Sequence, residues 1–187
     1  MSTLELKELS HPAGEVIKIA SGKTLDLKTQ GSVTMPTGSV LQVVNFQTGA
    51  VATGTTVIPH DDSIPQITEG TEFMTLAITP KNTSNLLKID VVMHVTMNGA
   101  NYMISALFQD TTASALAAIN VSLAQGANWT NSLSYTHYMT AGTTNATTFK
   151  VRGGPNGSAT FTFNGQSGGR IYGGVAASSI TITEIQG

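Results

Sequence analysis

The side chains best suited to catalysis or ligand binding lie in three short segments. The first is His60-Asp61-Asp62, which places an imidazole and two carboxylates in one loop. Adjacent residues of a single loop hold a metal ion only when another element supplies further ligands. A solvated turn with hydrogen bonds from the Asp side chains to nearby backbone explains the run better. The sequence therefore predicts no metal site here.

The second segment, residues 134–138, has the alternating pattern of a strand and contains His137. Alternation places Tyr135 and His137 on one face of that strand and Tyr138 on the other. His94 lies in a similar alternating run. Proton transfer at either histidine requires a partner acid or nucleophile, and no motif supplies one. We expect His94 to be a hydrogen-bonded residue on one face of a sheet, and we expect no catalytic residue in the chain.

The third segment, residues 126–131, holds the only tryptophan, Trp129, in a polar loop sequence. An aromatic face flanked by amides suits stacking on a sugar ring and hydrogen bonding to its hydroxyl groups. Alternatively, Trp129 covers the core or a subunit interface, and both interpretations stay open at this point. If a host-surface glycan is bound, the candidate residues are Asn128, Trp129, Asn131, Tyr135 and Tyr138.

Composition narrows the classes of function. The chain has 187 residues, of which 11% are charged and 40% hydrophobic, with a net charge of −2 and no cysteine. No basic run is present, which argues against a nucleic-acid or anionic-membrane partner. No apolar run approaches the roughly 18 residues of a membrane span. No phosphate-binding or dinucleotide-binding glycine motif occurs, so no cofactor is expected.

An eight-residue repeat occupies residues 9–43. Apolar residues recur in two parallel series, which are Leu9, Ile17, Leu25, Val33 and Leu41, and Ile19, Leu27, Met35 and Val43. Each unit has two apolar positions two residues apart and a glycine-containing turn, which predicts one short strand with one apolar face. So small a unit cannot bury its apolar face alone.

Copies of the same chain around a symmetry axis would bury that face. We expect a trimeric, inter-chain β stalk at residues 1–39, with a knob at residues 40–187. The residues expected at the stalk axis are Leu9, Ile17, Ile19, Leu25, Leu27, Val33 and Met35. The alternative is that these strands pack on the downstream domain of their own chain. Residues 2–9 fit either an arm that continues the stalk or a helix begun by a Ser2–Glu5 capping box.

The remainder reads as strands separated by turn residues, which predicts an all-β, jelly-roll-like sandwich. The expected strands are Val40–Phe46, Phe73–Thr79, Leu86–Met97, Asn101–Gln109, Ala117–Leu123, Ser132–Met139, Thr147–Arg152, Thr160–Phe163 and Ile171–Ile185, the last as one strand or broken in two. Hairpin turns are expected at Asn98-Gly99, Asn164-Gly165 and Pro155-Asn156-Gly157. The one candidate helix is Thr111–Ala118. The loop Gly49–Gly70 is expected to lie across the sandwich or to reach a neighbouring subunit.

Several of these segments resemble virion proteins of tailed bacteriophages, particularly the marine type. Residues 22–27 and 31–43 resemble the neck that leads into a terminal β domain in their fibre proteins. Residues 75–81, 106–110 and 179–185 resemble parts of that domain. The resemblance implies a homotrimer on the outside of the particle, with a knob that binds host receptors or decorates the virion. It also implies contact with other virion proteins through the N-terminal arm.

Three functions remain open from the sequence. A fibre knob would attach to the host surface, a capsid decoration protein would ornament the shell without a receptor, and a fibre-borne enzyme would cleave glycan. Glycosidic cleavage needs two opposed carboxylates. The available carboxylates are few and scattered, namely Asp61, Asp62, Glu69, Glu72, Asp90 and Asp110. We therefore expect no enzyme activity, and an exposed Trp129 at the knob tip would favour attachment over decoration.

Overall fold

The computed structural model describes residues 21–23, 35–99, 102–122 and 126–187. The chain divides into two compact units, residues 1–34 and residues 35–187. In the first unit only the exposed turn at residues 21–23 is described. The predicted stalk strands and every predicted axis residue except Met35 therefore lie outside the described residues.

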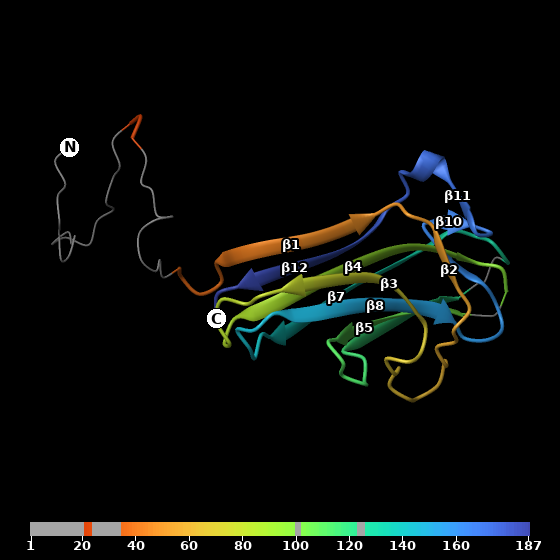
Figure 1. The fold of residues 1–187 in the computed structure, drawn as a ribbon, viewed down its shortest axis with the longest axis horizontal. Helices are drawn as coiled ribbons and strands as arrows, with labels where there is room; N and C mark the ends of the chain where they lie inside the picture. The colour runs from red at the N-terminus through yellow and green to blue at the C-terminus, as the bar shows by residue number, and fades with distance from the viewer. Residues whose placement is uncertain (1–20, 24–34, 100–101, 123–125) are drawn as a thin grey trace. The chain divides into compact units, whose positions relative to one another are not determined.

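Residues 35–187 form a β-sandwich of two antiparallel sheets (Figure 1). The main strands of the first sheet, in spatial order, are β1 (Val40–Thr48), β12 (Ser178–Ile185), β4 (Leu86–Met97) and β7 (Asn131–Thr140). Those of the second sheet are β3 (Thr71–Ile78), β8 (Thr147–Pro155), β5 (Tyr102–Gln109) and β6 (Ala117–Ser122). Smaller elements are β2 (Ala52–Gly54), β9 (Phe161–Phe163), β10 (Gly165–Gln166), β11 (Gly169–Arg170) and the 3₁₀ turn η1 (Tyr172–Gly174).

The eight main strands pair in a nested order. The first pairs with the last (β1 with β12), the second with the seventh (β3 with β8), the third with the sixth (β4 with β7), and the fourth with the fifth (β5 with β6). The contacts β12–β4 and β8–β5 complete the two sheets. A long antiparallel hairpin rolled up in this way is a jelly roll. The predicted all-β, jelly-roll-like sandwich is confirmed.

Alternation along the strands builds the core. In β4, Leu87, Ile89, Val91, Met93 and Val95 are all buried, and the residues between them face outward or are half-buried. They pack with buried residues of the second sheet in one cluster. A period of two in a half-buried strand is what places every second side chain on the same face.

The predicted helix at Thr111–Ala118 is wrong. This stretch is a turn followed by the start of β6 at Ala117. The backbone N–H of Ile67 donates to the carbonyl of Ala113, and the N–H of Ala115 donates to the carbonyl of Pro65. The backbone groups that a helix would have paired internally are thus satisfied by a distant segment, which overrides local helix propensity.

The predicted hairpins are also wrong, because their turn residues join strands of different sheets. Asn98-Gly99 leads from β4 in the first sheet toward β5 in the second, and Pro155-Asn156-Gly157 leads from β8 back to β9. The tight hairpin in this region is β10–β11, closed by Ser167 (φ 49°) and Gly168 (φ 76°). Positive φ at both central residues is the requirement of a type I′ turn.

One predicted strand and one predicted turn also differ from the structure. Of the predicted strand Ile171–Ile185, only Ser178–Ile185 is a strand, and the turn η1 precedes it. Asn164, placed by the sequence in a hairpin turn, is fully buried with φ 54°. Its side-chain amide donates to the carbonyls of Thr48 and Ala50. It therefore ties the end of β1 to the end of β9 instead of closing a hairpin.

The loop Gly49–Gly70 lies across its own sandwich, one of the two arrangements expected. Ile58 is fully buried, and its backbone N–H donates to the carbonyl of Pro155 at 3.0 Å. Gln66 forms an isolated β-bridge with Ser114. The loop also contains β2, which pairs with β9 and which the sequence pattern does not reveal.

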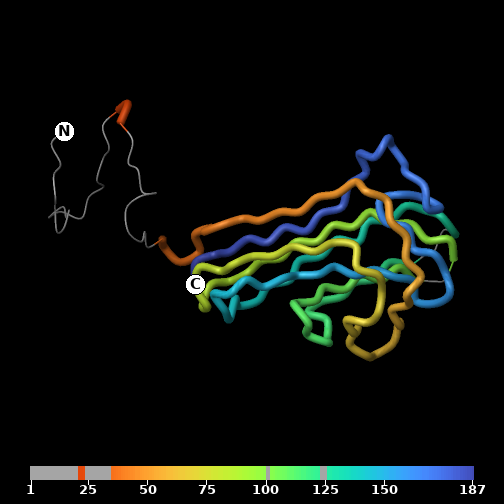
Figure 2. Tube along the Cα trace, viewed as in Figure 1, coloured from red at the N-terminus to blue at the C-terminus, as the bar shows by residue number. Residues whose placement is uncertain are grey.

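The sandwich has two distinct ends. At the proximal end, Gly38 donates its N–H to Gln186 and Gly187 donates to the side chain of Asn85, so the C-terminus lies beside the start of β1 (Figures 1 and 2). At the distal end, the loops that follow β1 and β4 and precede β7 come together. Asn128 donates its N–H to Met97 there, and Thr160 donates to the side chain of Asn98.

Candidate functional site

Trp129 lies at the distal end with 55% of its surface exposed. The preceding Asn128 has φ 64° and donates its N–H to Met97 at the end of β4. This left-handed residue, a conformation that asparagine tolerates, turns the chain outward before β7 begins. The carbonyl of Trp129 accepts a hydrogen bond from the side chain of Asn131. The indole is therefore held on the surface by its loop and does not cover the core.

A neutral polar pocket of about 350 Å³ belongs to the same loop cluster. Its lining comes from three separate stretches of chain, and consists of Asn98, Asn128, Thr160, Thr162, Ser167 and Gly168. Gln166 donates to the carbonyl of Asn128 at 2.6 Å, and the Ser167 hydroxyl lies 3.1 Å from the Asn128 side-chain oxygen. These bonds fasten the β10–β11 hairpin to the loop that carries Trp129.

The chemistry of this pocket is that of amides and hydroxyls without a formal charge. Such groups can both donate and accept hydrogen bonds, which suits a neutral ligand with many hydroxyl groups. The exposed indole beside them offers an apolar face for stacking. The sequence identified Asn128 and Trp129 from their adjacency, but Asn98, Thr160 and Ser167 were missed because only the fold brings them there.

The two tyrosines of the predicted glycan set do not belong to this cluster. Tyr135 points inward, and its hydroxyl lies 3.1 Å from the hydroxyl of Ser105 on the opposite sheet. Burial raises the pKa of Tyr135. Tyr138 faces outward opposite Lys88, seven residues along β7 from Asn131. At about 3.3 Å per residue that separation is roughly 23 Å. The structure thus groups Asn128, Trp129 and Asn131 and leaves out both tyrosines.

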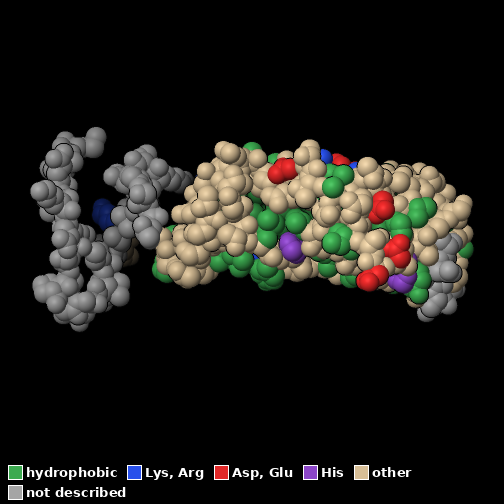
Figure 3. All heavy atoms as spheres, turned by 90° about the horizontal axis from the view of Figure 1, so that it is seen from below, with side chains coloured by type: hydrophobic (Ala, Val, Ile, Leu, Met, Phe, Trp, Pro, Cys, Tyr) green, Lys and Arg blue, Asp and Glu red, His purple; other side chains and the backbone are tan. Residues whose placement is uncertain are grey.

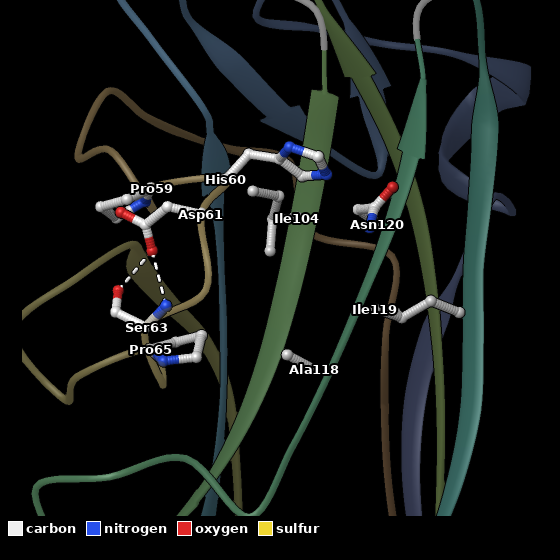
Figure 4. A pocket seen from close by; sticks show the side chains of 9 residues that line it. All are labelled: Pro59, His60, Asp61, Ser63, Pro65, Ile104, Ala118, Ile119 and Asn120. Carbon is white, nitrogen blue, oxygen red and sulfur yellow. Dashed lines mark hydrogen bonds between the residues drawn. The ribbon is translucent and has the colours of Figure 1, made fainter.

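A second, smaller pocket of about 180 Å³ lies between residues 59–65 and strands β5 and β6 (Figure 4). His60 stacks on Tyr102 with ring centroids 3.9 Å apart and an angle of 6° between the rings. Asp61 accepts hydrogen bonds from the backbone N–H and the hydroxyl of Ser63, which lower the pKa of Asp61. This is the side-chain-to-backbone turn expected from the sequence.

The other polar candidates are held in structural interactions. Asp90 pairs with Lys88 at 2.7 Å and accepts from Thr136 at 2.6 Å. Asp110 accepts hydrogen bonds from the side chain of Thr147 and the backbone of Thr148. In the part of the chain that the structure describes, no three His, Cys, Asp or Glu residues are arranged to share a metal ion.

The histidines fit the sheet positions expected of them. His94 and His137 are both half-buried within β4 and β7. Burial lowers the pKa of His137, which favours its neutral form. No helix in the described part of the chain has the length and apolarity that crossing a membrane requires.

No protein-family model matches the sequence, and no curated protein matches it either. Solved structures with a similar strand arrangement include Eiger TNF from S. frugiperda, at 11% identity and a TM-score of 0.46 over 76% of this chain and 92% of that one. The sugar-binding EclA C-terminal domain matches at 13% identity and a TM-score of 0.34, over 86% and 89% of the two chains.

A viral structure, that of the infectious bursal disease virus Gx strain, also matches at 9% identity and a TM-score of 0.39. The match covers 88% of this chain and 41% of the viral chain. At these low sequence identities, the similarity concerns the β-sandwich fold alone.

Proposed function

We propose that the chain is a non-enzymatic virion protein of a tailed bacteriophage, a trimeric fibre whose β-sandwich knob attaches to a neutral glycan on the host surface. The observation that carries the proposal is the exposure of Trp129 beside a neutral polar pocket at the distal end. A tryptophan that served only to complete a core would be buried. The resemblance of the sequence to phage fibre necks supplies the viral setting.

The position of the pocket supports this role. The described chain enters the sandwich at Met35, and Gly38 is bonded to the C-terminal strand at the proximal end. The distal loops lie at the opposite end of the same strands. We propose that residues 1–34 join the protein to its own copies and to other virion proteins, which leaves the distal loops free to meet a host surface.

Binding without cleavage is the chemistry we assign to this site. Glycoside hydrolysis uses a pair of carboxylates flanking the bond. The residues that line the pocket beside Trp129 include no Asp or Glu. Capsid decoration, the alternative function, gives no reason for an exposed tryptophan next in sequence to a residue that lines a polar pocket. We therefore place host attachment ahead of decoration.

Replacing Trp129 with alanine is expected to weaken glycan binding at least about tenfold, because stacking on an indole contributes roughly 1.4 kcal/mol or more. The measurement is binding of the purified trimer to an array of neutral bacterial surface polysaccharides. Trp129→Phe, which keeps an aromatic face, is expected to retain most of the affinity. Thermal unfolding should be the same for all three proteins, since Trp129 is exposed.

Wild-type protein that binds no glycan on such an array, or an alanine variant that binds as well as wild type, would contradict the attachment role. Electron cryomicroscopy of the intact particle separates the alternatives further. Density on tail fibres with the distal end outward is expected. Density on the capsid shell would make decoration the function.

A further inference from the structure

The outward face of the first sheet changes character from one end to the other. Antiparallel partners that lie directly opposite share a face, so the strand register gives rows of neighbours across the sheet. The row nearest the proximal end consists of the apolar residues Val40, Ile185 and Leu86 and ends at Thr140 on β7. Rows toward the distal end are polar, as in the row of Asn45 and Thr181.

The next row has an exposed apolar side chain at each end, Val43 on β1 and Tyr138 on β7, with Thr183 and Lys88 between them. We call Val40, Val43, Leu86, Tyr138 and Ile185 the proximal patch. Val40 and Val43 are each 56% exposed, and Tyr138 is 54% exposed. An apolar cluster of this kind on a protein surface marks an interaction site.

Strand β1 is an edge strand with little of the protection that natural edges carry. Its sequence, VLQVVNFQT, contains no charged residue and no proline, and one bulge occurs between Val40 and Gln42. Natural proteins place lysines, prolines or covering loops on such edges to prevent association with other chains. Strand β1 carries no charge, and the one charged side chain in the two rows beside it, Lys88, is paired with Asp90 of the same chain. This edge is therefore open to association with another chain.

The sequence indicates which molecule covers the edge at β1. Met35 and Val43 are the last two members of the second eight-residue series, which begins with Ile19 and Leu27. Both are exposed on the sandwich, Met35 to 40% and Val43 to 56%, so the described part of their own chain does not bury them. A small repeat that its own domain leaves exposed is buried by identical copies around an axis.

We propose that the proximal patch is a contact surface between copies of this chain, which extends the self-association of the repeat onto the knob. This inference rests on the proposed homotrimer and names the knob surface that it uses. Residues of one copy that pack here remove the apolar rows of β1, β4 and β12 from water, while the distal pocket beside Trp129 stays open.

The charge on this face is compatible with close approach of identical copies. Among the described outward residues of the four main strands, the only Asp, Glu, Lys or Arg side chains are Lys88 and Asp90. They pair with each other at 2.7 Å within one chain. Each copy therefore brings no net charge to the contact, and identical copies do not repel one another there.

The test compares the full-length wild type with Val43→Asp, Gln47→Asp and Leu25→Asp by light scattering over a dilution series. Val43→Asp is expected to raise the concentration at which the trimer dissociates at least about tenfold, since it buries a carboxylate in the contact. Gln47→Asp is the matched control, with the same charge on the same strand beyond the patch, and is expected to behave as wild type.

Leu25→Asp separates this inference from the trimer itself. A monomeric wild type would overturn both proposals. A wild-type trimer that Leu25→Asp disrupts and Val43→Asp leaves unchanged would overturn the patch alone. A lower melting temperature of Val43→Asp without any change in mass would also overturn it, because the patch would then be covered within one chain. Circular dichroism should show the same β-sheet content in all variants.

Discussion

Replacing Glu184 with glutamine is expected to lower the free energy of unfolding by about 3 kcal/mol, because it removes the charge from a buried carboxylate surrounded by donors. Glu184 is fully buried at the proximal end of β12. It accepts hydrogen bonds from the side chain of Gln42 at 2.5 Å, the side chain of Asn85 at 2.6 Å and the backbone N–H of Lys81 at 2.6 Å. These groups come from two segments of the chain, strand β1 and the loop between β3 and β4.

A glutamine at this position has one acceptor oxygen and a pair of N–H donors. Its amide would point donors at donors, and at least one buried hydrogen bond would be lost. The measurement is urea unfolding of the two proteins at pH 7. Glu72→Gln is the matched control, since Glu72 is an exposed carboxylate paired with Arg152 at 3.5 Å, and a loss below about 1 kcal/mol is expected there. Equal losses for the two variants would contradict the role of Glu184.

The same carboxylate gives stability a dependence on pH. Burial raises the pKa of Glu184, but the hydrogen bonds from Asn85, Gln42 and the backbone of Lys81 and Asn82 outweigh burial and hold the pKa below its ordinary value of 4.5. The folded protein therefore holds this proton less tightly than the unfolded chain. The contribution of Glu184 is complete above about pH 4.5 and declines as the pH falls through the lowered pKa. The stability difference between wild type and Glu184→Gln is expected to shrink over that acidic range.

Much of the fold is predictable from the sequence because alternation is a local property. The pattern of Ile180, Ile182 and Glu184 in the last strand already places all three on one face, and the structure confirms that each is buried. The donors that make burial of Glu184 tolerable lie about 100 or more residues away in the chain. Only the nested pairing of β1 with β12 brings Gln42 to this carboxylate.

Turn residues were less informative, because they determine the local backbone conformation but not which strands the turn connects. Asn98-Gly99 has the composition of a hairpin turn, yet the chain crosses there from one sheet to the other. The same limit applies to the site. Asn128, Trp129 and Asn131 were found because they are neighbours in sequence, whereas Thr160 and Ser167 join them through tertiary contacts. Tyr135 and Tyr138 were grouped with them by proximity in sequence, although alternation and distance along β7 separate both from the pocket.

Replacing Gly154 with alanine is expected to destabilise the sandwich by about 3 kcal/mol, because the loop Gly49–Gly70 passes directly over this glycine. A Cβ at Gly154 would overlap the carbonyl oxygen of Thr56, and that atom belongs to backbone, which has no rotamer to change. The loop is held there by the hydrogen bond from Ile58 to Pro155. It must therefore move as a unit, which would expose the buried Ile58 side chain.

Two measurements distinguish this displacement from a general loss of packing. Urea unfolding gives the change in stability, and hydrogen exchange at the amide of Ile58 reports whether the loop has left the sheet. Gly99→Ala is the matched control, because a Cβ there meets Ala159 at an ordinary contact distance of 3.7 Å. Its unfolding and exchange should match wild type. If Gly154→Ala also unfolds like wild type, with Ile58 still protected, then the loop does not lie across β8 as the structure places it, and the second sheet has a free outer face.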